Sequence, residues 1–410
     1  MLYYELKKIW VKPGTKIAMI ILAVSLFSTC WSAVRGVYWL DDNHERVYGI
    51  EGIQKVKAAK KEWAGTLTEE VIADVIRENT RINETPEARS EDINQKNIAY
   101  RWTLGFADIR YLIVRSFCEF QEADYYKPDR LKPEDAQYFY ENRIQHLKDW
   151  LNEEYQQSKL SEDEREFLIE RYEALETPLE YDYADGWKQL FEFSDNITMI
   201  MMLVLGFVSA SVFAGEFSYK ADAIFYSSYH GRGRAVAAKM GAAILFITAV
   251  YAVIMFLFTV IVLAMLGTDG AGLAIQTNQD YGWKSFYMLT NMQEYQLIVI
   301  GGYIGTMFIL LLTMLVSAMT RSTALAAIIP FIVIFIPSFV GNSKYEIVGE
   351  ILAVLPDRLL AIYNSISLFY LYHIGGKVVG VMSVIFPLYA VLAVALCPPL
   401  YHIYRRKESR

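Results

Sequence analysis

The residues whose types and spacing most clearly indicate a task lie in one connection between two apolar runs, at residues 213–239. Glu216 directly follows an apolar run, and Arg232 lies between two glycines shortly before the next run begins. A short amphipathic helix held at both ends by membrane helices presents charge that a partner can dock against and move. The residues singled out for this role are Glu216, Phe217, Tyr219, Ser227, Gly231, Arg232 and Lys239. An ordinary loop that follows the positive-inside rule explains them equally well.

The sequence lacks the common motifs of enzymes. There is no G-x-x-x-x-G-K-[ST] loop to hold the phosphates of ATP, no H-E-x-x-H zinc pattern and no G-x-S-x-G nucleophile turn. Five histidines are scattered without ligand spacing, and three cysteines form no zinc or disulfide pattern. We therefore expect no metal, no cofactor and no enzymatic activity in this chain.

Charge is segregated along the chain. Residues 41–195 hold 36 of the 46 acidic and 21 of the 39 basic residues, a net charge of −15, whereas the remainder has a net charge of +8. With 54% hydrophobic residues overall, this pattern indicates an acidic soluble part inserted into a basic membrane part. No basic domain is present that would bind nucleic acid.

Six apolar runs predict an all-α polytopic membrane protein with six transmembrane helices. They lie at residues 17–34, 197–214, 240–266, 297–319, 323–340 and 378–401. The first is about 27 Å long as a helix, near the thickness of a bilayer core, and a cleaved signal peptide is the alternative for it. None of the runs carries Asp, Glu, Lys or Arg, which argues against ion-coupled transport.

These runs divide the chain into five parts. The predicted parts are an amphipathic interfacial helix at 1–14, a first transmembrane helix at 15–36, an extracytoplasmic domain at 37–194, a five-helix transmembrane region at 195–404 that includes a cytoplasmic coupling helix at 216–234, and a tail at 405–410.

Basic residues in the short loops predict the orientation. If the N-terminus is cytoplasmic, thirteen Lys and Arg residues fall on the cytoplasmic side and five in the short external segments. We therefore expect a multi-pass protein of the plasma membrane with both termini in the cytoplasm and the acidic domain outside.

The acidic domain is predicted to be mainly helical. Thr68 before two glutamates, Pro133 before Glu134, and a capping box that begins at Ser161 each mark the start of a helix.

This layout resembles the permease subunit of type 2 ABC exporters, in the bacterial form with an enlarged first external loop. The resemblance covers the order of segments along the whole chain, and its most specific part is F-A-x-E-F at 213–217, followed by Gly231-Arg232 and then Lys239. It implies a second permease chain, identical or related, and separate ABC ATPase subunits that bind ATP and Mg. The coupling helix would then be seated in a cleft of the ATPase. Glu216 would end the second span, and Arg232 would anchor the other end of the coupling segment or pair with an acid of the partner.

The same resemblance gives the external connections an expected role. Residues 267–294 with Trp283, and residues 342–377 with Pro356 and Asp357, are expected to form an external gate. A peptide, an antibiotic or a lipid-like amphiphile is the expected cargo, because the runs offer apolar and hydroxyl side chains rather than charges.

Two other functions remain open from the residues alone. The acidic domain of a membrane-anchored sensor or binding protein could capture a cationic ligand, with the cytoplasmic connection as a relay. A pair of carboxylates in this domain could also serve a membrane-bound hydrolase.

Overall fold

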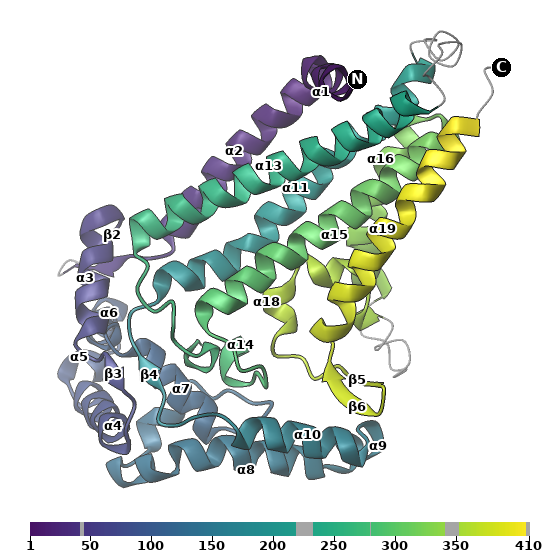
Figure 1. Cartoon of the computed structure of the whole chain (residues 1–410). Helices are drawn as coiled ribbons and strands as arrows, with labels where there is room; N and C mark the ends of the chain where they lie inside the picture. Colours follow the sequence, from purple (N-terminus) through teal and green to yellow (C-terminus); the bar gives the residue numbers. More distant parts are fainter. Residues whose placement is uncertain (42–44, 219–232, 279, 341–351, 407–410) are drawn as a thin grey trace.

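Long helices dominate the computed structural model, which describes residues 1–41, 45–218, 233–278, 280–340 and 352–406. The longest helices run side by side, and a separate group of shorter helices gathers at one end of them (Figure 1). The N-terminal helix, the last residues of the final helix and the ends of the connection at 219–232 lie at the opposite end (Figure 1).

Five helices are long and apolar enough to span a membrane. They are α2 (Pro13–Arg35), α11 (Asp185–Ser218), α13 (Arg234–Leu266), α15 (Asn291–Thr320) and α19 (Met382–Arg406). The run at 323–340 forms α16 (Thr323–Val340), of which Thr323–Phe335 is a shorter apolar helix. The polytopic helical membrane fold is therefore confirmed, whereas the sixth span stays a prediction.

Burial separates the central spans from the peripheral ones. The most apolar window of α11 is 67% buried and that of α15 is 61% buried, against 33% for α2, 33% for α13 and 22% for α19. The exposed faces of these peripheral helices carry large apolar side chains such as Phe27, Phe256 and Val391, which suit contact with lipid or with another membrane chain.

The helices extend beyond the apolar runs read from the sequence. Because α11 begins at Asp185 rather than near residue 195, Asp195 lies in its third turn. Lys239 lies in the second turn of α13, and Glu294 lies in the first turn of α15. The apolar runs thus lack charged residues, whereas the complete helices contain them.

The N-terminal helix α1 (Leu2–Val11) is separate from α2. Lys12 has φ −57° and ψ 132°, an extended conformation that the following Pro13 favours, and the chain therefore bends between the two helices. Ile9 is buried, α1 packs against α13, and the Trp10 ring lies 6.3 Å from that of Phe246 on α13. A helix is therefore present where the N-terminal interfacial helix was predicted, and its place at a membrane surface stays a prediction.

Residues between α2 and α11 form a mainly helical insert. Its α-helices are α3 (Gly49–Lys61), α4 (Glu69–Asn83), α5 (Pro86–Arg89), α6 (Ile93–Thr103), α7 (Ala107–Phe117), α8 (Phe139–Asn152), α9 (Glu154–Lys159) and α10 (Glu162–Glu173). Two 3₁₀ helices, η1 (Lys127–Arg130) and η2 (Pro133–Tyr138), precede α8.

Helix caps in the insert follow the sequence signals. The Thr68 hydroxyl accepts the Val71 N–H at 3.3 Å and begins α4. Ser161 and Glu164 form a reciprocal capping box at the start of α10. Pro133 begins a 3₁₀ helix that continues into α8, so this predicted start is correct in position and differs in helix type.

Short strands and turns complete the described fold. The strands are β1 (Trp39–Leu40), β2 (Arg46–Val47), β3 (Gly65–Thr66), β4 (Glu180–Tyr181), β5 (Leu371–Ile374) and β6 (Lys377–Gly380), and each pairs antiparallel with its neighbour in sequence order, β1 with β2, β3 with β4 and β5 with β6. The remaining short helices are η3 (Ile275–Thr277), α14 (Asp280–Trp283), η4 (Pro356–Leu359) and α18 (Ile362–Ser365).

Candidate functional site

The elbow between α1 and α2 is fixed to the end of α11. The Lys12 ammonium donates hydrogen bonds to the backbone oxygen of Ser211 at 3.0 Å and to its hydroxyl at 3.3 Å. A Cβ on Gly215, one turn further along α11, would lie 3.3 Å from the same ammonium. The absence of a side chain at Gly215 thus allows Lys12 to approach the helix closely.

The end of α11 is also tied to two other spans. The Ser317 hydroxyl on α15 accepts the Ala214 N–H at 3.0 Å and donates to the Ala210 carbonyl at 2.6 Å. The buried Phe213 ring meets the Tyr404 ring of α19 edge-to-face at 4.7 Å. The end of α11 is thus in direct contact with both α15 and α19.

Lys239 occupies a mainly aromatic environment at the same end. Its ammonium lies 5.9 Å from the ring centre of Phe213 and 5.7 Å from that of Tyr404, and the residue is only 3% exposed. A cation over aromatic faces is stabilised by the ring quadrupoles. Lys239 thus joins α13 to the ends of α11 and α19.

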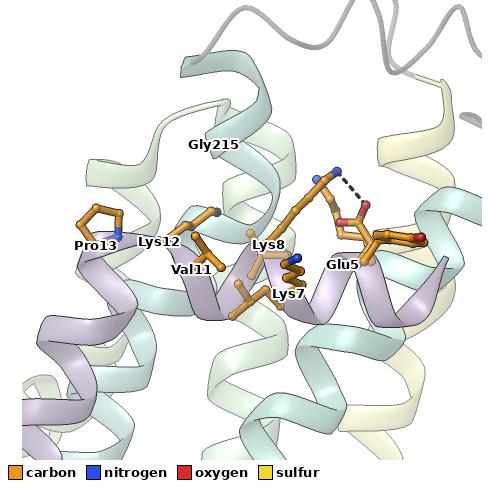
Figure 2. A pocket seen from close by; sticks show the side chains of 11 residues that line it. Glu5, Lys7, Lys8, Val11, Lys12, Pro13 and Gly215 are labelled. Atoms are coloured by element: carbon orange, nitrogen blue, oxygen red, sulfur yellow. Dashed lines mark hydrogen bonds and ion pairs between the residues drawn. The ribbon is translucent and has the colours of Figure 1, made fainter.

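A cavity of about 560 Å³ lies beneath α1. Four lysines, Lys7, Lys8, Lys12 and Lys239, line it together with Glu5, which pairs with Lys8 at 2.8 Å. Figure 2 shows α1 crossing this region, with Lys12 near Gly215 and the Lys8–Glu5 pair further along the helix. This cavity and the helix ends around it are called the α1 junction below. Four of the five charged residues that line the cavity are basic.

The residues predicted to contact a partner fall partly within the α1 junction. Lys239 contributes directly to it. Glu216 and Phe217 are in the last turn of α11, where the structure describes the backbone alone. Tyr219, Ser227, Gly231 and Arg232 lie outside the described residues. Their roles stay predictions, but the described helices place both ends of their segment at this junction (Figure 1).

Trp283, predicted to be part of an external gate, is buried against the insert. The residue is 3% exposed, and its ring lies 5.1 Å from that of Phe139 on α8. Its carbonyl oxygen accepts a hydrogen bond from the Arg143 guanidinium at 3.1 Å. The connection between α13 and α15 is therefore held by the insert.

The other two gate residues lie at a different place, on η4. A Cβ on Gly305 of α15 would lie 3.6 Å from the Pro356 carbonyl, so η4 packs closely on that helix. Asp357 has a buried carboxylate oxygen with no hydrogen-bond partner among the described atoms, and its pKa is raised by burial, with Arg358 opposing the rise. Gating by Trp283, Pro356 and Asp357 stays a prediction.

An ion cluster that was not predicted from the sequence joins the insert to the spans. Lys60 on α3 contacts Asp108 on α7 at 3.0 Å and Asp185 on α11 at 2.6 Å, and Lys188 contacts Asp108 at 2.7 Å. Tyr181 donates its hydroxyl to the same Asp108 at 3.1 Å. Burial opposes the charge on Asp108, but the two lysines outweigh it and hold its pKa well below the usual range.

The face of α3 that carries Lys60 also forms ion pairs with the connection that follows α13. Lys57 and Lys61 both pair with Asp269, the latter at 2.9 Å. The spacing of Lys57, Lys60 and Lys61 places all three on one side of a helix, which was the available sequence signal. Their acidic partners are distant in sequence, so the pairing itself could not be read from one chain.

Arg143 on α8 is a second clamp on this connection. Its guanidinium donates to the carbonyls of Trp283 at 3.1 Å, Ser285 at 3.1 Å and Tyr172 at 3.3 Å, and it lies 3.9 Å from the Tyr172 ring centre. The residue is 3% exposed. The insert therefore binds the α13–α15 connection through ion pairs from α3 and hydrogen bonds from α8.

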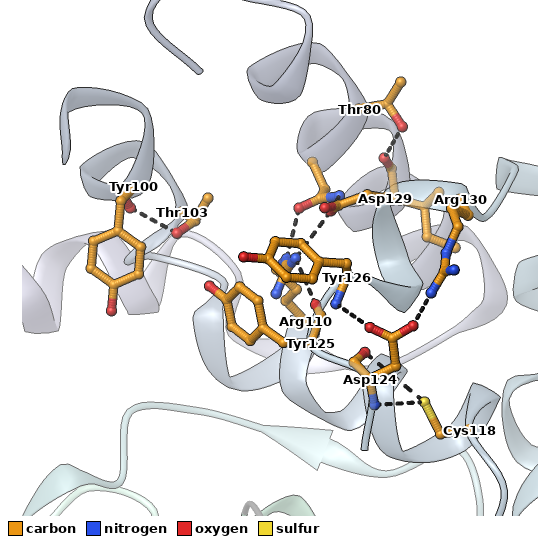
Figure 3. A network of polar contacts seen from close by, with 12 residues as sticks. Thr80, Tyr100, Thr103, Arg110, Cys118, Asp124, Tyr125, Tyr126, Asp129 and Arg130 are labelled. Atoms are coloured by element: carbon orange, nitrogen blue, oxygen red, sulfur yellow. Dashed lines mark hydrogen bonds and ion pairs between the residues drawn. The ribbon is translucent and has the colours of Figure 1, made fainter. Parts of the chain in front are cut away.

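A third polar network lies inside the insert and is drawn in Figure 3. Arg110 on α7 donates to Asn79 on α4 at 2.7 Å and to Asp129 on η1 at 3.0 Å. Its guanidinium also lies 4.3 Å from the ring centre of Tyr125. These mutual pairings hold three elements together, so the network is best explained as structural.

The described residues contain no group of three or more His, Cys, Asp or Glu side chains arranged to hold a metal ion. Comparisons of the chain with protein-family models, with curated proteins and with solved structures found no match.

Proposed function

We propose that the chain is the membrane-embedded permease subunit of an ATP-driven exporter of the type 2 ABC class. It would act as a pair of identical or related chains, with separate ABC ATPase subunits docked at the α1 junction. ATP and Mg would be bound by those partners, and the insert and the connections beside it would lie outside the plasma membrane. The chain itself would supply the path across the membrane and the coupling helix whose movement opens that path.

The observation that carries this proposal is the α1 junction. Lys12 ties the elbow of α1 to α11, Ser317 ties α11 to α15, and Tyr404 packs α19 on the end of α11. A push on the connection between α11 and α13 would therefore reach α1 and three spans together. This is the mechanical property that a subunit driven by an external ATPase requires.

At the end of the spans next to the insert, the connection between α13 and α15 would respond to such movement of the helices. Lys57 and Lys61 bind Asp269, and Arg143 binds the carbonyls of Trp283 and Ser285. Tilting of α13 or α15 would thus pull on the insert through the connection between them. We propose that the insert limits how far this connection opens, so that the external gate and the insert move as one.

Cargo recognition would depend on apolar and hydroxyl groups. Between α13 and α15 lies a groove of about 560 Å³ in which Thr248 bonds Tyr303 at 2.8 Å and Thr259 bonds Tyr295 at 2.6 Å. Such a surface matches a peptide, an antibiotic or a lipid-like amphiphile better than a small ion.

ATP hydrolysis by the complex tests the coupling role. The tagged chain is recovered with its partners from its native membrane, reconstituted in lipid vesicles, and assayed for ATP hydrolysis. Replacing Arg232 with Glu would lower the ATP hydrolysis recovered per permease chain on the order of tenfold, because the anion weakens docking and most of the ATPase is lost during purification.

The matched control is Arg405→Glu, the same charge reversal on an exposed residue of α19 at the same end of the molecule. It should leave the hydrolysis rate near that of the original complex. Equal rates in the Arg232→Glu complex and the original complex would exclude the proposed coupling role. A sensor that captures a cationic ligand would then be the better explanation of the acidic insert.

A further inference from the structure

An apolar groove of about 670 Å³ lies between α2 and α13 at the end next to the insert. Phe27 and Trp31 of α2 line one wall, and Ile261 and Met265 of α13 line the other. Phe27 is 70% exposed and Trp31 is 56% exposed, so neither is covered by another part of the described chain. The volume is within the range of sites that hold a small ligand.

The depth of the groove matches one leaflet of a bilayer. Its lining runs along α2 from Ala23 to Arg35. At 1.5 Å per residue this stretch is about 18 Å long, close to half of a hydrocarbon core about 30 Å thick. The groove thus reaches from near the middle of the membrane to the surface on the side of the insert.

Arg35 lines the groove beside Tyr48, and Arg46 lies against the neighbouring ring of Tyr38. The Arg35 guanidinium lies 4.3 Å from the Tyr48 ring centre, and Arg46 lies 4.5 Å from that of Tyr38, whose ring is 5.8 Å from Tyr48. Hydrogen bonds from Arg46 and Arg35 lower the pKa of the Tyr48 hydroxyl. In the part of the chain that the structure describes, neither arginine has a carboxylate within ion-pair distance.

The two cations adjoin an insert that is acidic overall, and Asp41 and Glu45 lie near Arg46 in the sequence. Two cations held near one another without an acidic partner attract an anion, and a guanidinium offers parallel donors that match the oxygens of a phosphate. Trp31 lies beside them, where an indole suits the boundary between hydrocarbon and headgroups. An apolar groove that is one leaflet deep and has cations at its outer end matches the chemistry of an anionic lipid.

We propose that this groove holds an acyl chain of one anionic phospholipid from the leaflet on the side of the insert, with its phosphate at Arg35 and Arg46. The lipid would join α2, α13 and the first residues of the insert. This inference requires only that the helices span a membrane and is independent of any ATPase partner.

Native mass spectrometry of the purified, delipidated full-length chain tests the proposal. The chain is titrated with phosphatidylglycerol and with phosphatidylcholine of identical acyl chains. We expect one phosphatidylglycerol to bind more tightly than phosphatidylcholine. Arg35→Gln and Arg46→Gln should each lower the phosphatidylglycerol affinity about fivefold, the effect of one basic residue near an anionic headgroup.

Lys55→Gln is the matched control, because Lys55 is an exposed cation of the insert that already pairs with Glu51 at 2.8 Å. Its loss should leave the preference for phosphatidylglycerol unchanged. Ala23→Trp fills the inner end of the groove from an exposed position and should weaken lipid binding without affecting weak binding of glycerol phosphate. This separates a lipid site from a site for free phosphate.

Each variant is first checked for native elution in size exclusion and for native helical content. Two arginine variants are used so that misfolding of one does not remove the test. Equal affinities for the two lipids, or an unchanged preference in a folded Arg35→Gln or Arg46→Gln chain, would overturn the proposal. Efficient disulfide dimerisation of a Phe27→Cys chain that binds no phosphatidylglycerol would also overturn it, in favour of a second copy in the groove.

Discussion

At Arg143 a guanidinium is buried, and its described hydrogen bonds go to backbone carbonyls. Burial lowers its pKa, with Tyr172 opposing this, yet a guanidinium remains charged at any ordinary pH. We expect Arg143→Met to destabilise the protein on the order of 3 kcal/mol, because the carbonyls of Trp283 and Ser285 lose their donor. Thermal unfolding of the purified chain measures this as a lower midpoint.

The control for that variant is Arg77→Met. Arg77 pairs with Asp74 on an exposed face of α4, and an exposed pair contributes little. Its loss should leave the midpoint nearly unchanged. Similar midpoints for the Arg143 and Arg77 variants would show that Arg143 does not clamp the α13–α15 connection.

Asp108 provides a test that depends on pH. Its folded pKa is lowered, because Lys188 and Lys60 outweigh the effect of burial, so the native state binds fewer protons than the unfolded chain. Its stabilising contribution is therefore present above about pH 4 and is lost as the pH falls through the folded pKa. Asp108→Asn should cost on the order of 3 kcal/mol at pH 7, since it leaves the buried Lys60 and the half-buried Lys188 without that partner.

Thermal midpoints of Asp108→Asn and the original chain, measured from pH 7 down to pH 3, check this expectation. The difference between the two should shrink below about pH 4. Asp74→Asn is the control, because Asp74 has the same chemistry in an exposed pair. A constant difference across the range would contradict the assignment of the Asp108 charge as the source of stability.

At the scale of elements, the packing of α16 on α11 depends on one glycine. A Cβ on Gly206 would lie 2.6 Å from the Pro330 ring of α16, which cannot turn aside. Gly206→Ala should therefore destabilise the protein by about 1–3 kcal/mol, as overpacking does. The measurement is again the thermal midpoint of the purified chain.

Gly241 in α13 is the matched position for this prediction. Its nearest neighbour for an added Cβ is a Leu2 methyl at 3.5 Å, an ordinary contact. Gly241→Ala should be neutral or slightly stabilising, because alanine favours a helix over glycine. Equal effects of the two substitutions would mean that close packing of α16 does not depend on Gly206.

Which elements could be predicted depended on how local their signals are. The caps at Thr68 and Ser161 and the break at Pro13 are set by residues within a turn, and they were correctly read. The start of α11 was placed too late, because its first turns are polar and are covered by the insert. Apolarity marks the part of a helix that suits a membrane, not where the helix begins.

At the scale of the whole molecule, the separation of membrane part and insert followed directly from charge. How the two are joined did not, because Lys60 meets Asp108 and Asp185, and Arg143 meets Trp283, across long distances in sequence. The candidate coupling residues were only partly placed, since Lys239 lies in the α1 junction and Arg232 lies outside the described residues.

The proposed exporter function requires a partner at the α1 junction. A gentle detergent pull-down of the tagged chain from its native membrane tests this requirement most directly. Mass spectrometry should find an ABC-type ATPase in near-equal amount with the original chain, and should find it lost with Arg232→Glu. Recovery of the folded chain without any such ATPase would contradict the account and direct attention to the acidic insert as a ligand-binding domain.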